Sequence, residues 1–264
     1  MPTLVTPKAH QTWRKLTFSH PSAFMNLALE EAMARVLSAG QQDQPTVRFW
    51  TNPRAVVVGR FQEPSEEVDL ARCDSSGIQV ARRFTGGGTV YHDEATLNFT
   101  ILRQRTNEFS ILGFQDANLQ LVVKALDDLG RRSISTPNSI LVAGRKICGA
   151  AASMGMHFAL WHCSILVDTD TRLLEAVLSP SKSAIKSRFV HSRWQPVTTV
   201  STALSQTVPL DHVARSLERS LEGTWGLELE AGKVTREEDR YAEALYKRKY
   251  SSDEWNLKGN RGLG

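Results

Sequence analysis

The sequence has few of the features that mark secreted, membrane-bound or metal-bearing proteins. It contains three cysteines, Cys73, Cys148 and Cys163, without Cys-x-x-Cys spacing, so neither a disulfide framework nor a structural zinc site is expected. No run approaches the roughly 20 apolar residues of a membrane span. Residues 1–5 lack the apolar core of a signal peptide. We therefore expect a cytoplasmic protein without a membrane partner.

Long runs of one charge sign are also absent. The chain has 32 basic and 28 acidic residues and a net charge of +4, and its longest basic run is Lys247-Arg248-Lys249. Its pI near 9.0 permits acidic partners, but this spread of charge does not indicate nucleic acid binding, and we expect none. With 41% hydrophobic residues in 264, the chain can bury a substantial core.

The most informative segment is Arg-Arg-Phe-Thr-Gly-Gly-Gly-Thr-Val-Tyr-His-Asp at positions 82–93. Glycine loses the most conformational entropy on folding, so three in a row are costly. A simple turn needs one or two, which suggests a loop whose N–H groups face an anion such as phosphate. The adjacent arginines suit phosphate or carboxylate. A bulged hairpin is the alternative that the glycines alone leave open.

A second segment, Pro-Asn-Ser-Ile-Leu-Val-Ala-Gly-Arg-Lys-Ile-Cys-Gly-Ala-Ala at 137–151, follows at a characteristic distance. Together the two segments resemble the lipoate-protein ligase A family of the biotin/lipoate ligase superfamily. Asn-Leu-Ala-Leu-Glu-Glu at 26–31 looks like that family's opening helix, and residues 47–50 with 56–62 look like its first core hairpin. The resemblance covers roughly residues 12–256, and four ordered motifs are far more specific than one glycine loop.

The alternation of strands and helices predicts an α+β protein with a mixed α/β sheet and packed helices. The resemblance implies the biotin/lipoate ligase catalytic fold. We expect a catalytic domain over residues 1–250 and a tail over 251–264, a truncated junction where longer relatives continue into an accessory domain. Such a short form is expected to work with a separately encoded small accessory subunit.

Hydrophobic periodicity and turn signals predict the individual elements. Helices are expected at 22–38, 115–129, 209–225 with Asp211 as N-cap, and after the capping box Thr235-x-x-Glu238. Strands are expected at 46–51 and 55–60, joined at Asn52-Pro53, and at 78–84 and 96–103. A hairpin turning at Ala143-Gly144 and a longest strand at 157–168 complete the pattern.

The resemblance implies an ATP-dependent ligase. Such an enzyme joins lipoate, or octanoate, to AMP with the help of Mg²⁺ and then transfers the acyl group to a lysine on a lipoyl-accepting domain. Attack of a carboxylate on the α-phosphate brings two anions together, and a positioned lysine offsets their repulsion. Lys146 matches the family's lysine and is the expected catalytic residue.

Other roles follow by matching positions. Trp50, Val58 and Phe61 are candidate walls of the lipoyl slot and fit an ordinary core equally well. Asn138 is also a weak candidate metal ligand, because Ser139 replaces the family's aspartate. Arg82 is either a ligand contact or a solvated strand end. The expected substrate and adenylate contacts are Arg83, Thr85, Gly86, Gly87, Gly88, Val90, Tyr91, His92, Asn138, Gly149 and His162.

Two alternatives remain open at this point. Cysteine-dependent octanoyl or lipoyl transferases of the same superfamily need no ATP, and Cys148 lies on the same strand face as Lys146 if the hairpin is regular. A buried cysteine acting as a small apolar residue is the simpler reading of Cys148. A non-catalytic relative that binds lipoyl domains is the second alternative, and Ser139 and Cys163 are the departures that allow it.

Overall fold

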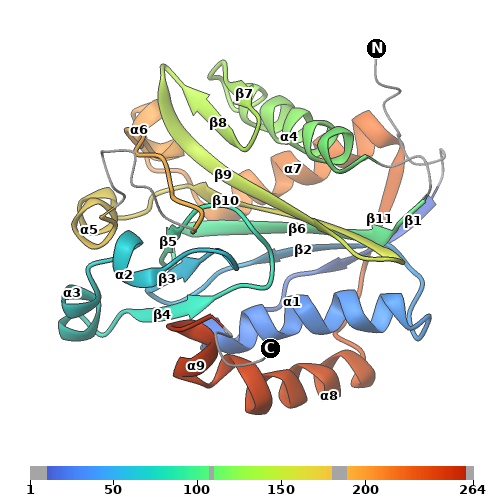
Figure 1. Cartoon of the computed structure of the whole chain (residues 1–264). Helices are drawn as coiled ribbons and strands as arrows, with labels where there is room; N and C mark the ends of the chain where they lie inside the picture. Colours follow the sequence, from blue (N-terminus) through green and yellow to red (C-terminus); the bar gives the residue numbers. More distant parts are fainter. Residues whose placement is uncertain (1–10, 107–109, 180–188, 260–264) are drawn as a thin grey trace.

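Two β-sheets form the frame of the protein, and helices cover both faces of the larger one (Figure 1). The computed structural model describes residues 11–106, 110–179 and 189–259. The larger sheet has eight strands in the order β11-β1-β2-β6-β10-β9-β8-β7, and the smaller has three in the order β4-β3-β5. Strand β1 runs parallel to β2 and β11, while β2, β6, β10 and β9 pair antiparallel, so the expected mixed sheet is present.

The strand bounds are β1 Gln11–Leu16, β2 Thr46–Trp50, β3 Ala55–Val58, β4 Gln79–Arg82, β5 Val90–His92, β6 Thr96–Gln104, β7 Ile134–Thr136, β8 Ser139–Val142, β9 Arg145–Met154, β10 Phe158–Leu166 and β11 Leu227–Ala231. The helices are α1 Ala23–Ser38, α2 Pro64–Glu67, α3 Leu70–Ser75, α4 Ile111–Asp127, α5 Thr171–Val177, α6 Val200–Leu204, α7 Leu210–Trp225, α8 Arg236–Leu245, the π-helical turn Tyr246–Tyr250, and α9 Asp253–Asn256. Over the described ranges, none of these helices has the length and apolar character that a membrane crossing requires.

Side-chain alternation gives the large sheet two different faces. On β6, Leu97, Phe99 and Ile101 belong to the main core beneath α4 and α7, as the period of two predicts. The intervening Asn98 and Thr100 are buried on the other face, toward α1 and the small sheet. Polar side chains are therefore concentrated between the two sheets.

The prediction that the strands at 46–51 and 55–60 form a hairpin is wrong. Strand β2 pairs with β6 in the large sheet, whereas β3 lies between β4 and β5 in the small one. The chain crosses from one sheet to the other at Asn52-Pro53. A turn signal indicates where a chain changes direction, but it does not say which strand becomes the neighbour.

Helix ends agree with the sequence only in part. The capping box between Thr235 and Glu238 is present. Helix α4 begins earlier than predicted, at a cap in which Ser110 Oγ accepts from Gly113 N. Asp211 is not the cap of α7: it lies in the first turn, where it pairs with Arg215. An acidic residue is favoured both as the N-cap of a helix and in its first turn. The two positions are only one or two residues apart, so the sequence alone does not tell which of them Asp211 occupies.

The predicted β8–β9 turn is confirmed, with φ of +49° at Ala143 and +75° at Gly144. The strand expected to be longest, β10, has nine residues, one fewer than β9. The hairpin is also irregular, because Leu141 pairs with Lys146 while Ile140 pairs with Cys148. Ile147 is thus an extra residue in a β-bulge, and the simple two-residue alternation fails there.

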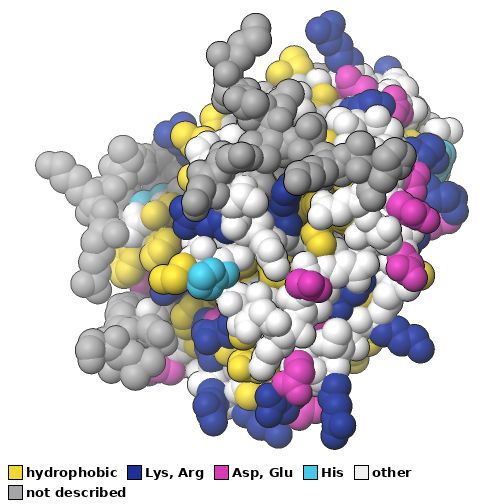
Figure 2. Space-filling model, turned by 90° about the vertical axis from the view of Figure 1, so that its right-hand side faces the viewer, with side chains coloured by type: hydrophobic (Ala, Val, Ile, Leu, Met, Phe, Trp, Pro, Cys, Tyr) yellow, Lys and Arg dark blue, Asp and Glu magenta, His cyan; other side chains and the backbone are white. Residues whose placement is uncertain are grey.

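The surface carries charges of both signs. On the face drawn in Figure 2, the described Lys and Arg side chains are interspersed with Asp and Glu. This distribution agrees with the modest net charge and shows no continuous basic tract over the described part of that face.

Residues 251–259, expected as a tail, pack against the small sheet. Trp255 is buried, its Nε1 donates to the carbonyl of Arg82 at 2.8 Å, and the Asn256 side chain accepts from Arg82 N. The guanidinium of Arg82 is 1% exposed and donates to the carbonyls of Gly59, Arg60, Gln62 and Trp255. Arg82 is therefore neither a solvated strand end nor a ligand contact: it binds backbone segments together.

Arg82→Leu is expected to lower the free energy of unfolding by about 3 kcal/mol, because it leaves several buried carbonyls without a donor. Urea unfolding followed by circular dichroism measures the change. The matched control is Arg72→Leu on exposed α3, for which a change within about 0.5 kcal/mol is expected. A loss below about 1 kcal/mol for Arg82→Leu would contradict the assignment.

Candidate active site

A cavity of about 680 Å³ lies between the two sheets. The large sheet contributes one row of residues in register across four neighbouring strands: Trp50 on β2, Asn98 on β6, Ser164 on β10 and Gly149 on β9. The small sheet and its glycine loop form the opposite wall. Residues 190–193 and Gln195 line a further part of it.

Lys146 reaches into this cavity over Gly149. A β-carbon at position 149 would lie 3.1 Å from Lys146 Nζ, so a larger residue there would displace the ammonium. Within the described ranges, Lys146 has no ion-pair partner. Burial lowers the pKa of Lys146; the neighbouring Cys148 opposes this shift and Arg83 adds to it. An anion in the cavity would reverse this cost of burial.

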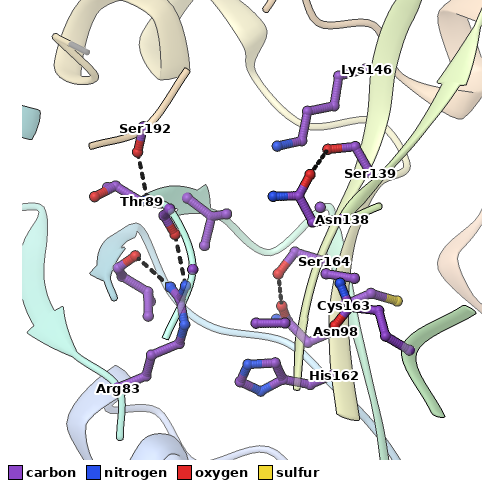
Figure 3. Close-up of a pocket in the computed structure, with 18 of the residues that line it drawn as sticks. Arg83, Thr89, Asn98, Asn138, Ser139, Lys146, His162, Cys163, Ser164 and Ser192 are labelled. Atoms are coloured by element: carbon purple, nitrogen blue, oxygen red, sulfur yellow. Dashed lines mark hydrogen bonds between the residues drawn. The ribbon is translucent and has the colours of Figure 1, made fainter. Parts of the chain in front are cut away.

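Arg83 approaches from the opposite side (Figure 3). Its guanidinium donates to the carbonyls of Gly86 and Gly88 at 2.7 Å, to the carbonyl of Val57, and to Thr85 Oγ1. Burial lowers the pKa of Arg83 to about 10, although Glu30 opposes the shift. The arginine therefore shapes the glycine loop directly while its charge, unpaired with any carboxylate among the described residues, adds to that of Lys146.

The glycine loop needs its glycines for different reasons. Gly87 has φ of +90°, and a β-carbon there would lie 3.0 Å from Arg83 Nη2. A β-carbon on Gly88 would lie 3.0 Å from Ser192 Oγ, which accepts from Thr89 N at 2.8 Å. Close approach by an arginine and a neighbouring loop thus explains two of the three glycines.

Below Lys146, buried polar groups form a connected floor. The ring of His162 lies with Nδ1 3.0 Å from Glu30 Oε2 and Nε2 2.9 Å from Thr85 Oγ1. Burial acts to raise the pKa of Glu30, but His162, the Thr100 hydroxyl and Arg48 together lower it below the ordinary 4.5. A chain of contacts thus runs from α1 through His162 to the residue that begins the glycine loop.

Ten of the site residues predicted from sequence line the central cavity: Trp50, Arg83, Gly87, Gly88, Val90, His92, Asn138, Lys146, Gly149 and His162.

Six other predicted residues lie outside that lining. Val58 is fully buried in the apolar core beside the small sheet, and Phe61 is 56% exposed beside Gly86, whose carbonyl accepts from Arg83. Thr85 acts through Arg83 and His162. Tyr91 and Cys148 border an adjoining cavity of about 550 Å³, which shares Lys146.

Sequence reasoning missed several lining residues, among them Glu30, Asn98 and Ser164. Glu30 belongs to the opening-helix motif, but a helical pattern does not reveal that its carboxylate points at a histidine on β10. Asn98 alternates with the apolar Leu97 and Phe99, and this was the available signal for a polar face.

A metal site built from side chains is not evident. No group of three or more His, Cys, Asp or Glu residues suited to a metal occurs within the described ranges. Asn138 Oδ1 lies 3.4 Å from Ser139 Oγ, and both are neutral. Glu30 is the one carboxylate among the described lining residues of the central cavity, and it is already bound to His162 and Thr100. The residues present do not form a carboxylate site of the kind that holds Mg²⁺.

Comparisons with known proteins identify this fold as the lipoyl protein ligase A/B catalytic domain. A family model described as the lipoyl protein ligase A/B catalytic domain matches residues 22–222. The chain is 34% identical to lipoate-protein ligase A subunit 1 of Thermoplasma acidophilum, over 88% of this chain and 91% of that protein. It is also 28% identical to the octanoyltransferase LipM of Brevibacillus brevis, over 94% and 99%. The chain belongs to the lipoyl protein ligase A/B family.

Solved structures show the same fold. A bi-partite lipoate protein ligase studied with its E2 lipoyl domain, from T. acidophilum, matches with a TM-score of 0.83 and 31% identity over 96% of this chain and 98% of that one. A T. acidophilum protein with bound lipoic acid matches at 0.81 and 32%, and a lipoate-protein ligase A bound with ATP at 0.83 and 32%. Both of these matches cover 94% of this chain and all of the other.

Glu30→Gln is expected to destabilise the protein by about 1–3 kcal/mol at pH 7. Because the folded-state pKa of Glu30 is lowered, its stabilisation is complete above the ordinary 4.5 and is lost as the pH falls through the folded value. The difference between wild type and variant should therefore shrink in urea unfolding as the pH falls below about 4.5. Exposed Glu243→Gln is the control. A difference that stays constant with pH would contradict this account.

Proposed function

We propose that this protein is an ATP-dependent lipoate-protein ligase that makes lipoyl-AMP and transfers the acyl group to a lysine of a lipoyl-accepting domain. The observation that carries the proposal is the pair of cations, Lys146 and Arg83, which face a shared cavity without a carboxylate partner among the described residues. A cavity of this charge suits a ligand that is anionic at both stages: carboxylate with triphosphate, and then acyl-adenylate.

The chemistry assigns Lys146 a defined task. A carboxylate oxygen of lipoate attacks the α-phosphorus of ATP. A new bond forms between this oxygen and the phosphorus, the bond from the phosphorus to the bridging oxygen breaks, and pyrophosphate leaves. Lys146 offsets the repulsion between the two anions and the charge that develops on the phosphoryl oxygens. In the second step the acceptor lysine attacks the acyl carbon and AMP leaves. Arg83 holds the glycine loop in shape so that its backbone can approach the phosphoryl group.

The relatives support both substrates. The T. acidophilum protein binds lipoic acid and the lipoate-protein ligase A binds ATP, each in a fold that this chain shares over 94% of its length. The described residues of this cavity form no carboxylate site for Mg²⁺, so the metal would arrive with the phosphates of ATP.

Similarity to the octanoyltransferase LipM supports the alternative of a cysteine-dependent transferase. The environment of Cys148 and Cys163 does not favour this alternative. Because of the bulge at Ile147, Cys148 pairs with the core residue Ile140 and is fully buried, instead of sharing a face with Lys146. Burial raises the pKa of Cys163 well above its ordinary value, and contact with Cys148 adds to the shift. Both cysteines are buried, whereas a reactive thiol is partly exposed.

Partners follow from the same comparison. The T. acidophilum relative is one subunit of a bi-partite ligase and was studied with its E2 lipoyl domain. We propose that the present chain likewise acts on a lipoyl-accepting domain together with a small, separately encoded accessory subunit.

Lys146→Ala is expected to reduce lipoyl-AMP formation a hundredfold or more, because it removes the charge that faces the reacting anions. The measurement is the intact mass of a purified lipoyl domain after incubation with free lipoate, with and without Mg-ATP, and in parallel with an octanoyl carrier protein. Exposed Lys247→Ala is the control. Undiminished turnover in Lys146→Ala would contradict the proposed mechanism. If the lipoyl domain were acylated only from the octanoyl carrier protein, and this activity were lost in Cys148→Ser, the protein would be a transferase.

Gly87→Ala is expected to slow adenylate formation about tenfold or more, because the added methyl would displace Arg83 from the loop. Gly77→Ala is a matched control: Gly77 also has positive φ, +64°, but a β-carbon added there would meet no atom within 4 Å. Both variants should lose about 1–2 kcal/mol of stability from backbone strain. Equal activity in the two variants would show that the contact between Arg83 and the glycine loop plays no part in adenylate formation.

A further inference from the structure

Asn98 carries a buried donor that the fold leaves unused. The residue is 1% exposed and lines the central cavity, and its Nδ2 has no hydrogen-bond partner within the described part of the chain. A buried amide without a partner costs about 1–3 kcal/mol, so such a group in a cavity wall calls for an explanation. Which atom of this amide faces the cavity is decided by a chain of hydrogen bonds that begins elsewhere.

The chain begins at groups that can only donate. Arg48 Nη2 donates to Asn26 Oδ1 at 2.7 Å, and the backbone N of His20 donates to the same oxygen at 2.8 Å. The amide of Asn26 is thereby oriented, and its Nδ2 donates to Asn52 Oδ1 at 2.9 Å. Asn52 Nδ2 is then the atom 2.9 Å from His92 Nδ1, so this ring nitrogen accepts.

The remaining links follow from the single proton of a neutral histidine. Burial, reinforced by Arg83 and His162, lowers the pKa of His92 to about 3, so the ring is neutral at pH 7. With Nδ1 accepting, Nε2 carries the proton and donates to Ser164 Oγ at 2.7 Å. The Ser164 hydroxyl must then donate to Asn98 Oδ1, also at 2.7 Å. Asn98 is left to present its N–H groups to a ligand.

Position in the sheet indicates which part of a ligand Asn98 meets. Lys146 Nζ lies over Gly149, and Gly149, Ser164 and Asn98 are neighbours in register on β9, β10 and β6. Two strand spacings, roughly 10 Å, therefore separate the ammonium side from Asn98. Trp50 continues the row on β2. Figure 3 shows Ser164 and Asn98 below Lys146, between it and His162.

We infer that Asn98 is a specificity-determining residue whose Nδ2 donates to the dithiolane sulfur at the far end of the acyl substrate, so that the site selects lipoate over octanoate. The inference rests on the proposed function, which places the carboxylate at Lys146. Sulfur is a weak acceptor, but octanoate offers none, and its methyl end would leave the buried amide unpaired. A site built to hydrogen-bond a substrate group discriminates against the analogue that lacks it.

The test compares kcat/KM for adenylate formation with lipoate and with octanoate, and the dissociation constants of both free acids by calorimetry. Wild type should favour lipoate by about fivefold or more. Asn98→Leu, of similar shape but without the donor, should reduce that ratio about fivefold, mainly by improving octanoate. The binding arm needs no ATP, so an inactive wild type that still prefers lipoate would count against the proposed function and not against Asn98.

Asn52→Asp tests the direction of the chain without changing a residue that lines the cavity. An aspartate accepts from both Asn26 and His92, so His92 Nε2 becomes the acceptor, Ser164 donates to it, and Asn98 turns its oxygen toward the ligand. The lipoate preference should fall as in Asn98→Leu. The matched control is Asn118→Leu, which replaces another fully buried asparagine, on α4 and outside the cavity, and should leave the ratio unchanged.

Three results would overturn the inference. They are equal binding of lipoate and octanoate by wild type, an unchanged ratio in folded Asn98→Leu, or an unchanged ratio in folded Asn52→Asp. Circular dichroism and thermal unfolding establish which variants are folded. Equal binding of lipoate and octanoate by wild type would overturn the inference even if both variants fail to fold.

Discussion

The structure depends on burying arginine side chains whose donors are taken up by backbone carbonyls. Arg82 and Arg83 are adjacent at the end of β4, and both are almost inaccessible. Arg82 joins the loop after β3 to the C-terminal segment, and Arg83 holds the glycine loop. A guanidinium has five donors in a fixed plane, which lets one residue fix several chain segments. Since carbonyls do not cancel its charge, Arg83 also leaves the cavity positive.

The two faces of the large sheet separate packing from chemistry. Along β10, the side chains of Trp161, Cys163 and Ile165 pack into the core beneath α4 and α7, while those of His162 and Ser164 face the cavity, to which Cys163 adds only the edge of its strand. This alternation puts the thiol of Cys163 on the apolar side and the hydrogen-bonding groups on the ligand side. The bulge at Ile147 does the same for Cys148 and Lys146, which a regular strand would have placed on one face.

The polar floor between the sheets consists of two hydrogen-bonded chains. One runs from Glu30 through His162 to Thr85 and so to the arginine of the glycine loop. The other runs from Arg48 through His92 to Asn98, with each donor and acceptor set by the link before it. The first supports the loop proposed to hold the phosphoryl group, and the second sets the polarity of the wall proposed to meet the acyl end. Connected buried networks of this kind fix one arrangement of their members.

The sequence by itself determined the family, the expected mixed sheet, the catalytic candidate Lys146, the turn at Ala143-Gly144 and the capping box at Thr235. These features are local: a glycine run, a turn pair or a cap records its backbone requirement within a few residues. Only the tertiary structure decided that β2 and β3 belong to different sheets, that Arg82 is structural, and that Cys148 faces the core. It also decided that Asn98 ends a chain begun at Arg48, on a different strand. Strand partners and buried hydrogen bonds join residues far apart along the chain, and no local pattern encodes which distant partner each will meet.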